Sequence, residues 1–159
     1  MLVKYRVILT AAVLNFCWLA SCDNAGAITD TNQAINARNW SYVNRIKVPF
    51  VIDDLNSSYE LYINLRHTGD YRYSNIFLRI HTRSPNGKVL SERKEFRLAL
   101  PDGQWLGTGT GNLYQYQLPL LENYRFAQKG QYVIEIEQNM RDNPLKEITD
   151  VGLRIIKNN

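Results

Sequence analysis

The chain has 159 residues, of which 45% are hydrophobic and 21% charged, and its formal net charge is +4. Basic and acidic residues are interspersed, and the sequence contains no basic run. This charge pattern argues against a nucleic-acid-binding protein, which needs a concentrated basic surface.

The N-terminal residues have the three parts of a bacterial lipoprotein signal. Lys4 and Arg6 form a positively charged start, and an apolar stretch follows from about Val7 to Leu19. This stretch is shorter than the roughly 20 residues that cross a bilayer as a helix. The tetrapeptide Leu19-Ala-Ser-Cys22 resembles a lipobox, in which small residues admit the signal peptidase and the thiol accepts a diacylglyceryl group. We expect removal of residues 1–21 and attachment to a membrane through acyl chains, such as palmitate, on Cys22.

Removal of the signal changes what the composition means. Cys17 lies within it, so the mature protein would have one lipidated cysteine and no intramolecular disulfide. Loss of Lys4 and Arg6 leaves 17 basic against 15 acidic residues, a net charge of +2. The basic character of the whole chain is thus partly a property of its signal.

The segment 22–39 is rich in Asn, Ala, Thr and Asp and has almost no large apolar residues. It is predicted to be a lipidated, flexible tether that lets the folded part stand off the bilayer. Residues 40–159 then form a single domain, because about 120 residues can enclose one core but not two.

This domain is predicted to be all-β. Apolar and polar residues alternate in segment 59–66, and the same period-2 pattern recurs in 75–83, 131–139 and 150–157. Ser84-Pro-Asn-Gly87 predicts a tight turn that leads into a strand from about Lys88. Further strands are expected at 40–51, 112–118 and 121–127. Short strands at regular spacing predict an antiparallel β-sandwich or jelly-roll-like domain.

No motif in the chain predicts catalysis, a metal site or a cofactor. The only histidines are His67, beside a loop, and His81, within a strand, and both are interpreted as structural residues. A hydrolase would require His67 to meet a nucleophile and a carboxylate in one pocket. The glycine-rich run 103–111 lacks the residues and the helix of a phosphate-binding loop, and is interpreted as a bulged loop held by Trp105. We therefore predict a protein that is not an enzyme.

Tyrosine is unusually frequent, with ten residues. Exposed aromatic and Arg side chains are typical of protein interfaces and of sugar-binding surfaces, although most of these tyrosines could equally pack at the edges of the sandwich. The candidate interaction residues are Tyr71, Arg72, Tyr73, Trp105, Tyr114 and Tyr116.

Three blocks of sequence, together with the lipobox, resemble the GldH family of gliding-motility lipoproteins of the Bacteroidetes. They are residues 61–75, residues 102–109, and residues 136–141 with 150–155. The resemblance implies a lipoprotein needed for gliding and associated with the machinery linked to type IX secretion. It also implies outer-membrane residence facing the periplasm, and envelope proteins as partners. Of the family's functional residues, only the lipidated cysteine maps onto this chain, at Cys22.

Our first hypothesis is therefore a non-enzymatic accessory subunit that docks on envelope motility or secretion components, and two other hypotheses remain beside it. A glycan-binding module would present Tyr114 or Trp105 in a groove, and a hydrolase would assemble a site around His67. The sequence leaves open the direct partner, the membrane leaflet and the oligomeric state.

Overall fold

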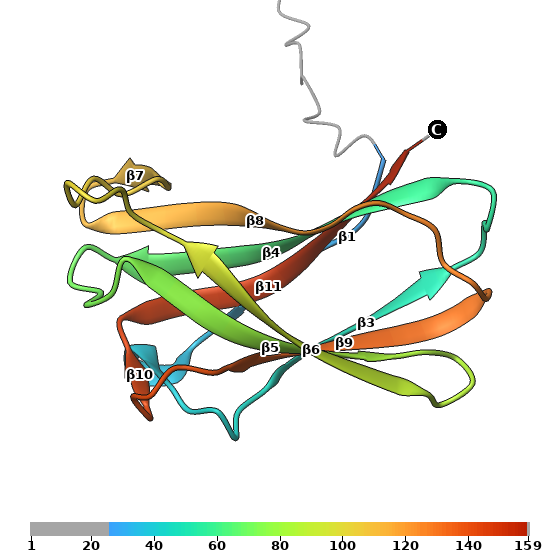
Figure 1. The fold of residues 1–159 in the computed structure, drawn as a ribbon, viewed down its shortest axis with the longest axis horizontal. Helices are drawn as coiled ribbons and strands as arrows, with labels where there is room; N and C mark the ends of the chain where they lie inside the picture. The colour runs from blue at the N-terminus through green and yellow to red at the C-terminus, as the bar shows by residue number, and fades with distance from the viewer. Residues whose placement is uncertain (1–25, 159) are drawn as a thin grey trace, which may run out of the picture.

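The computed structural model describes residues 26–158, so the predicted signal and Cys22 lie outside it. Two antiparallel sheets pack face to face (Figure 1), and the predicted all-β sandwich is confirmed. The five-stranded sheet has the order β1-β11-β4-β8-β7, and the four-stranded sheet has the order β3-β9-β5-β6. A small sheet of β10 and β2 lies at one end.

The strands are β1 (Ala27–Ala34), β2 (Asn39–Trp40), β3 (Ile46–Ile52), β4 (Ser58–Thr68), β5 (Asn75–Arg83), β6 (Val89–Arg97), β7 (Thr108–Thr110), β8 (Leu113–Tyr124), β9 (Gly130–Gln138), β10 (Leu145–Lys146) and β11 (Ile148–Asn158). One 3-10 turn, η1 (Asn36–Arg38), links β1 to β2.

The period-2 pattern explains which faces form the core. In β4 the apolar residues Tyr59, Leu61, Ile63 and Leu65 are at most 2% exposed, while the residues between them point to the outer face. Strands β5, β9 and β11 repeat this arrangement, as the sequence predicted. Burial of these rows from both sheets supplies most of the driving force for folding.

The predicted turn between β5 and β6 is confirmed. Gly87 N–H donates to Ser84 O at 2.9 Å, and Ser84 N–H donates to Lys88 O at 2.9 Å. Gly87 has a φ of 82°, a left-handed conformation that glycine adopts without strain.

Strand β1 corrects the predicted tether. Residues 27–34 pair antiparallel with β11, from Ala27 opposite Ile156 to Ala34 opposite Asp150. Most side chains of β1 are exposed, which agrees with the few apolar residues in this segment. The position of β1 therefore depends mainly on its backbone hydrogen bonds to β11. The prediction of a tether over 22–39 is therefore wrong from residue 27 onward, because residues 27–39 belong to the folded domain.

Strand β8 also differs from the prediction. The two strands expected at 112–118 and 121–127 form one strand, Leu113–Tyr124, paired with β4. Its register shifts near Pro119, where proline lacks the N–H that a regular ladder uses. The strand expected at 40–51 begins only at Ile46.

Candidate functional site at the aromatic end

Four of the six predicted interaction residues gather around His67 at one end of the sandwich. The ring centroids of Trp105, Tyr71, Tyr116 and Tyr114 lie 4.5, 5.0, 5.3 and 5.8 Å from that of His67. They come from the loop after β4, the segment before β7, and β8. Such separations are typical of packed aromatic rings. We call these five residues the aromatic cluster.

His67 is a core residue of this cluster. It is fully buried, and its Nδ1 lies 2.7 Å from Thr68 O, so Nδ1 carries the hydrogen because a carbonyl only accepts. Nε2 lies 3.2 Å from Tyr116 Oη. Burial lowers the pKa of His67 below its ordinary value of 6.5. Within residues 26–158 its polar contacts are a carbonyl and a phenol, which does not meet the requirement of the hydrolase hypothesis.

The lowered pKa of His67 predicts a loss of stability in mild acid. The unfolded chain takes up a proton at His67 near pH 6.5, whereas the folded chain resists protonation until lower pH. The contribution of neutral His67 to the free energy of unfolding is therefore complete above about pH 6.5. It declines as the pH falls toward the pKa of His67 in the folded chain. We expect the urea midpoint of His67→Gln to change less with pH than that of wild type between about pH 7 and 5. An equal pH dependence of the midpoint in the two proteins would contradict the burial of a neutral His67.

Tyr71 and Tyr116 correct the predicted interaction surface. They are only 4% and 8% exposed, and their hydroxyls donate to Asn75 O at 3.1 Å and Leu98 O at 2.9 Å. Neither side chain is available to a partner. Trp105 and Tyr114 are half-buried against the core, whereas Tyr73 is half-exposed and Arg72 is exposed.

The glycine-rich run closes the cluster, which agrees with its structural interpretation. A Cβ at Gly107 would lie 2.6 Å from the Tyr116 ring, and a Cβ at Gly109 would lie 3.0 Å from the Tyr114 ring. The run therefore lies flat on two tyrosines because it has no side chains at these positions. A β-bridge between Ala99 and Trp105 closes the loop at the start of the glycine-rich run.

An open groove of about 680 Å³ lies beside the cluster, between the loop 70–73 and the segment 141–147. Tyr73 Oη donates to Asp142 Oδ2 at 2.5 Å across it, which raises the pKa of Tyr73. Arg72, Arg141 and Lys146 add exposed positive charge. We call this the Tyr73 groove. No pattern in the sequence indicates that Arg141 and Lys146 lie beside Tyr73, because about 70 residues separate them.

Two residues in left-handed conformations brace this end of the molecule. Arg38 has a φ of 56° and Glu147 a φ of 69°, which is uncommon for residues with a Cβ. Glu147 N–H donates to Arg38 O at 2.8 Å, and the two side chains form an ion pair at 3.1 Å. Glu147 Oε2 also accepts from Thr68 Oγ1 at 2.6 Å. These contacts join η1, β4 and the start of β11, and so fix one wall of the Tyr73 groove.

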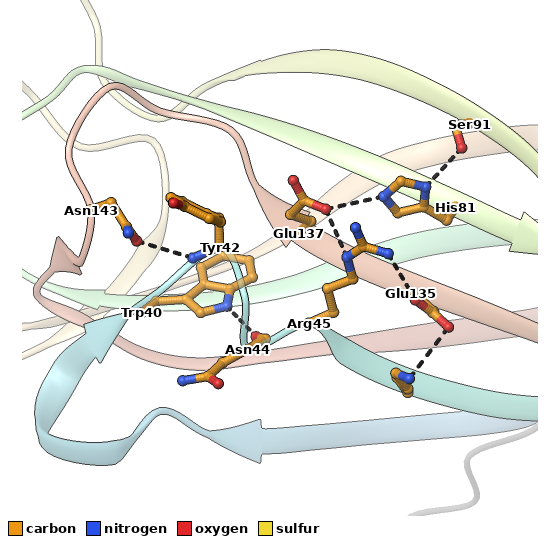
Figure 2. A network of polar contacts seen from close by, with 10 residues as sticks. Trp40, Tyr42, Asn44, Arg45, His81, Ser91, Glu135, Glu137 and Asn143 are labelled. Carbon is orange, nitrogen blue, oxygen red and sulfur yellow. Dashed lines mark hydrogen bonds and ion pairs between the residues drawn. The ribbon is translucent and has the colours of Figure 1, made fainter.

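A second polar network lies on the outer face of the four-stranded sheet (Figure 2). His81 Nδ1 is 2.7 Å from Ser91 Oγ, and His81 Nε2 is 3.2 Å from Glu137 Oε2. Arg45 Nε lies 2.7 Å from the same Glu137 oxygen and Arg45 Nη1 3.4 Å from Glu135. The neighbouring groove of about 840 Å³ is lined by Arg45 and both glutamates, and neither His81 nor Ser91 lines it. The network joins β6, β5, β9 and the residue before β3, and we interpret it as cross-strand stabilisation.

The carboxylate of Glu135 in this network is held in its charged form. Burial alone would raise the pKa of Glu135, but the Arg45 hydrogen bond and the Lys47 charge outweigh burial and lower it.

Between residues 26 and 158, no three His, Cys, Asp or Glu side chains are placed to hold a metal ion. In the same part of the chain, no helix is long and apolar enough to cross a membrane.

Comparison with known proteins finds one family and two close relatives. Residues 27–155 match the GldH lipoprotein family. The chain belongs to this family. It is 42% identical over 119 residues to the "Gliding motility lipoprotein GldH homolog" of Christiangramia forsetii, covering 69% of this chain and 74% of that protein. It is 30% identical over 156 residues to the "Gliding motility lipoprotein GldH" of Flavobacterium johnsoniae, covering 94% of this chain and 93% of that protein. No solved structure matches.

The GldH match covers nearly all of the sandwich that the structure describes. It begins at Ala27, the first residue of β1, and ends at Ile155 within β11. Since β1 and β11 pair along their lengths, the segment shared with the GldH family is the whole sandwich including its N-terminal edge strand.

Proposed function

We propose that this protein is a lipid-anchored, non-enzymatic accessory component of the envelope machinery for gliding motility and the associated type IX secretion. The observation that carries the proposal is membership of the GldH lipoprotein family, whose two reported relatives are named gliding motility lipoproteins. The buried and hydrogen-bonded state of His67 supports a non-catalytic role.

The folded domain lies close to the proposed anchor. Lys157 N–H donates to Gly26 O at 2.8 Å, so the chain joins the sandwich beside the end of β11. Cys22 precedes Gly26 by four residues, which reach at most about 14 Å in any conformation. A lipid on Cys22 would therefore hold this end of the sandwich near the bilayer.

The Tyr73 groove lies at the opposite end. Strand β4 begins at Ser58, opposite Asn158, and ends at Thr68 beside the groove, and its 11 residues extend about 35 Å. Figure 1 shows the loop after β4 at the end away from the C-terminus. An anchored molecule would thus direct Arg72 and Tyr73 away from the membrane, toward envelope proteins. We place it on the outer membrane facing the periplasm.

Replacement of the lipid-accepting cysteine tests the anchor. In Cys22→Ala we expect a folded protein that leaves the membrane fraction, because the core of the sandwich is formed by residues between Trp40 and Ile155. Expressed in a gliding host that lacks its own GldH, wild type should restore spreading and the variant should not. Cys17→Ala is the matched control and should behave like wild type. A Cys22→Ala protein that stays with the membrane, or restores spreading fully, would overturn the anchored mechanism.

A further inference from the structure

A third groove, of about 560 Å³, lies on the five-stranded sheet between β1 and the loop before β7. Asp30 and Asn32 of β1 line one side, and the segment Leu106–Thr108 lines the other. Asn64 and Gln117 lie between them on β4 and β8. This groove is separate from the Tyr73 groove and from the network of Figure 2, and we call it the amide groove.

Strand register sets its amides in one row. Asn32 of β1 is opposite Gly152 of β11, Gly152 is opposite Asn64 of β4, and Asn64 is opposite Gln117 of β8. Gly152 contributes no side chain, so the amides of Asn32 and Asn64 face each other across β11. Asn64 lies between the core residues of β4, and its side chain therefore points to the outer face of the sheet.

Two buried polar atoms in this region have no hydrogen-bond partner within residues 26–158. Asn64 is 7% exposed, and its Nδ2 donates to Asp30 Oδ1 at 2.9 Å, but its Oδ1 accepts nothing. Arg154, whose Nη1 lies 3.4 Å from the other Asp30 oxygen, has an unpartnered Nε. A buried polar atom without a partner costs about 1–3 kcal/mol. One of these atoms is an acceptor and the other a donor.

We propose that the amide groove binds a neutral oligosaccharide, a ligand class that goes beyond the anchoring and docking role. Of these two residues, Asn64 lines the groove and Arg154 does not. A hydroxyl group can donate to Asn64 Oδ1, and it can also accept from the amide groups of Asn32 and Gln117 in the same row. A carboxylate or phosphate would leave Asn64 Oδ1 without a donor. Amide side chains with paired donors and acceptors match the vicinal hydroxyls of sugars, and exposed Leu106 offers an apolar contact for a ring face.

The charges and the sheet edge favour this occupant over a cation or a peptide strand. Asp30, Arg66 and Arg97 line the groove, so two positive charges stand against one negative charge and a cation is disfavoured. The free edge of β8 is already partly capped, because Lys94 Nζ donates to Leu120 O at 2.5 Å and Pro119 has no N–H. Addition of a peptide strand along this edge would have to break the Lys94 contact.

Binding measurements on the full chain, in a detergent without a sugar headgroup, test the proposal. Isothermal titration would use a panel of neutral hexasaccharides of glucose, mannose, galactose and N-acetylglucosamine, with tripolyphosphate as the anionic probe. We expect saturable binding of at least one hexasaccharide. Gln117→Ala and Asn32→Ala should each weaken it about tenfold, the loss expected for one or two hydrogen bonds, and both residues are exposed.

The matched control is Gln131→Ala, an exposed glutamine on β9 of the other sheet, which should bind like wild type. Absence of binding to every hexasaccharide would overturn the proposal. Equal losses in Gln131→Ala and Gln117→Ala would also overturn it, as would tighter binding of tripolyphosphate than of any sugar.

Discussion

Gly152→Val is expected to detach strand β1 from the sandwich and to lower the free energy of unfolding by about 3 kcal/mol. A Cβ built on Gly152 would lie 1.8 Å from Thr31 O and 2.8 Å from Asn32 Cα. These are backbone atoms of the paired strand, so no side-chain rotation relieves the overlap and β1 must move. Its movement would also break the ion pair of Asp30 with Arg154.

Urea unfolding followed by Trp fluorescence, together with hydrogen exchange of the β1 amides, measures this effect. Gly87→Asn is the matched control, because a Cβ at Gly87 meets nothing within 4 Å and Asn tolerates left-handed backbone. We expect the control to stay within about 1 kcal/mol of wild type. Protected β1 amides and an unchanged midpoint in Gly152→Val would contradict the close approach of the two strands.

The same glycine explains why β1 was missed in the sequence. Segment 27–34 has the polar composition of a linker, and its alternation is too weak to indicate a buried face. The strand is held by the backbone of β11 and by the space above Gly152, both more than 100 residues away. In contrast, β4, β9 and β11 each bury an apolar row, and the period-2 pattern was sufficient to predict them.

The candidate site was predicted only in part, for two different reasons. Tyr114 and Tyr116 were placed on one face of a strand, and that alternation continues through Leu118 and Leu120, which are 6% and 4% exposed. The continued row was a sequence signal that this face is the core face. The burial of Tyr71 had no such signal, because it depends on how the loop after β4 folds back over His67.

Tyr116→Ala and Arg72→Ala are expected to separate stability from function. Tyr116 stacks on His67 at 5.3 Å, contacts Gly107 and donates to Leu98 O at 2.9 Å. Its truncation removes a buried aromatic ring, so we expect a loss of about 3–5 kcal/mol in unfolding free energy. Tyr116→Phe retains the ring and loses one hydrogen bond, so its cost should be about 1 kcal/mol.

Arg72→Ala should leave the unfolding free energy within about 0.5 kcal/mol of wild type, because the side chain is exposed. If the Tyr73 groove docks on envelope partners, this variant should nevertheless reduce spreading of the complemented gliding host at normal protein levels. Arg83→Ala, at the far end of β5, is the matched exposed-arginine control and should spread like wild type. Normal spreading with both Arg72→Ala and Tyr73→Ala would remove the Tyr73 groove as the docking surface, while leaving the aromatic cluster behind it as the core that closes this end of the sandwich.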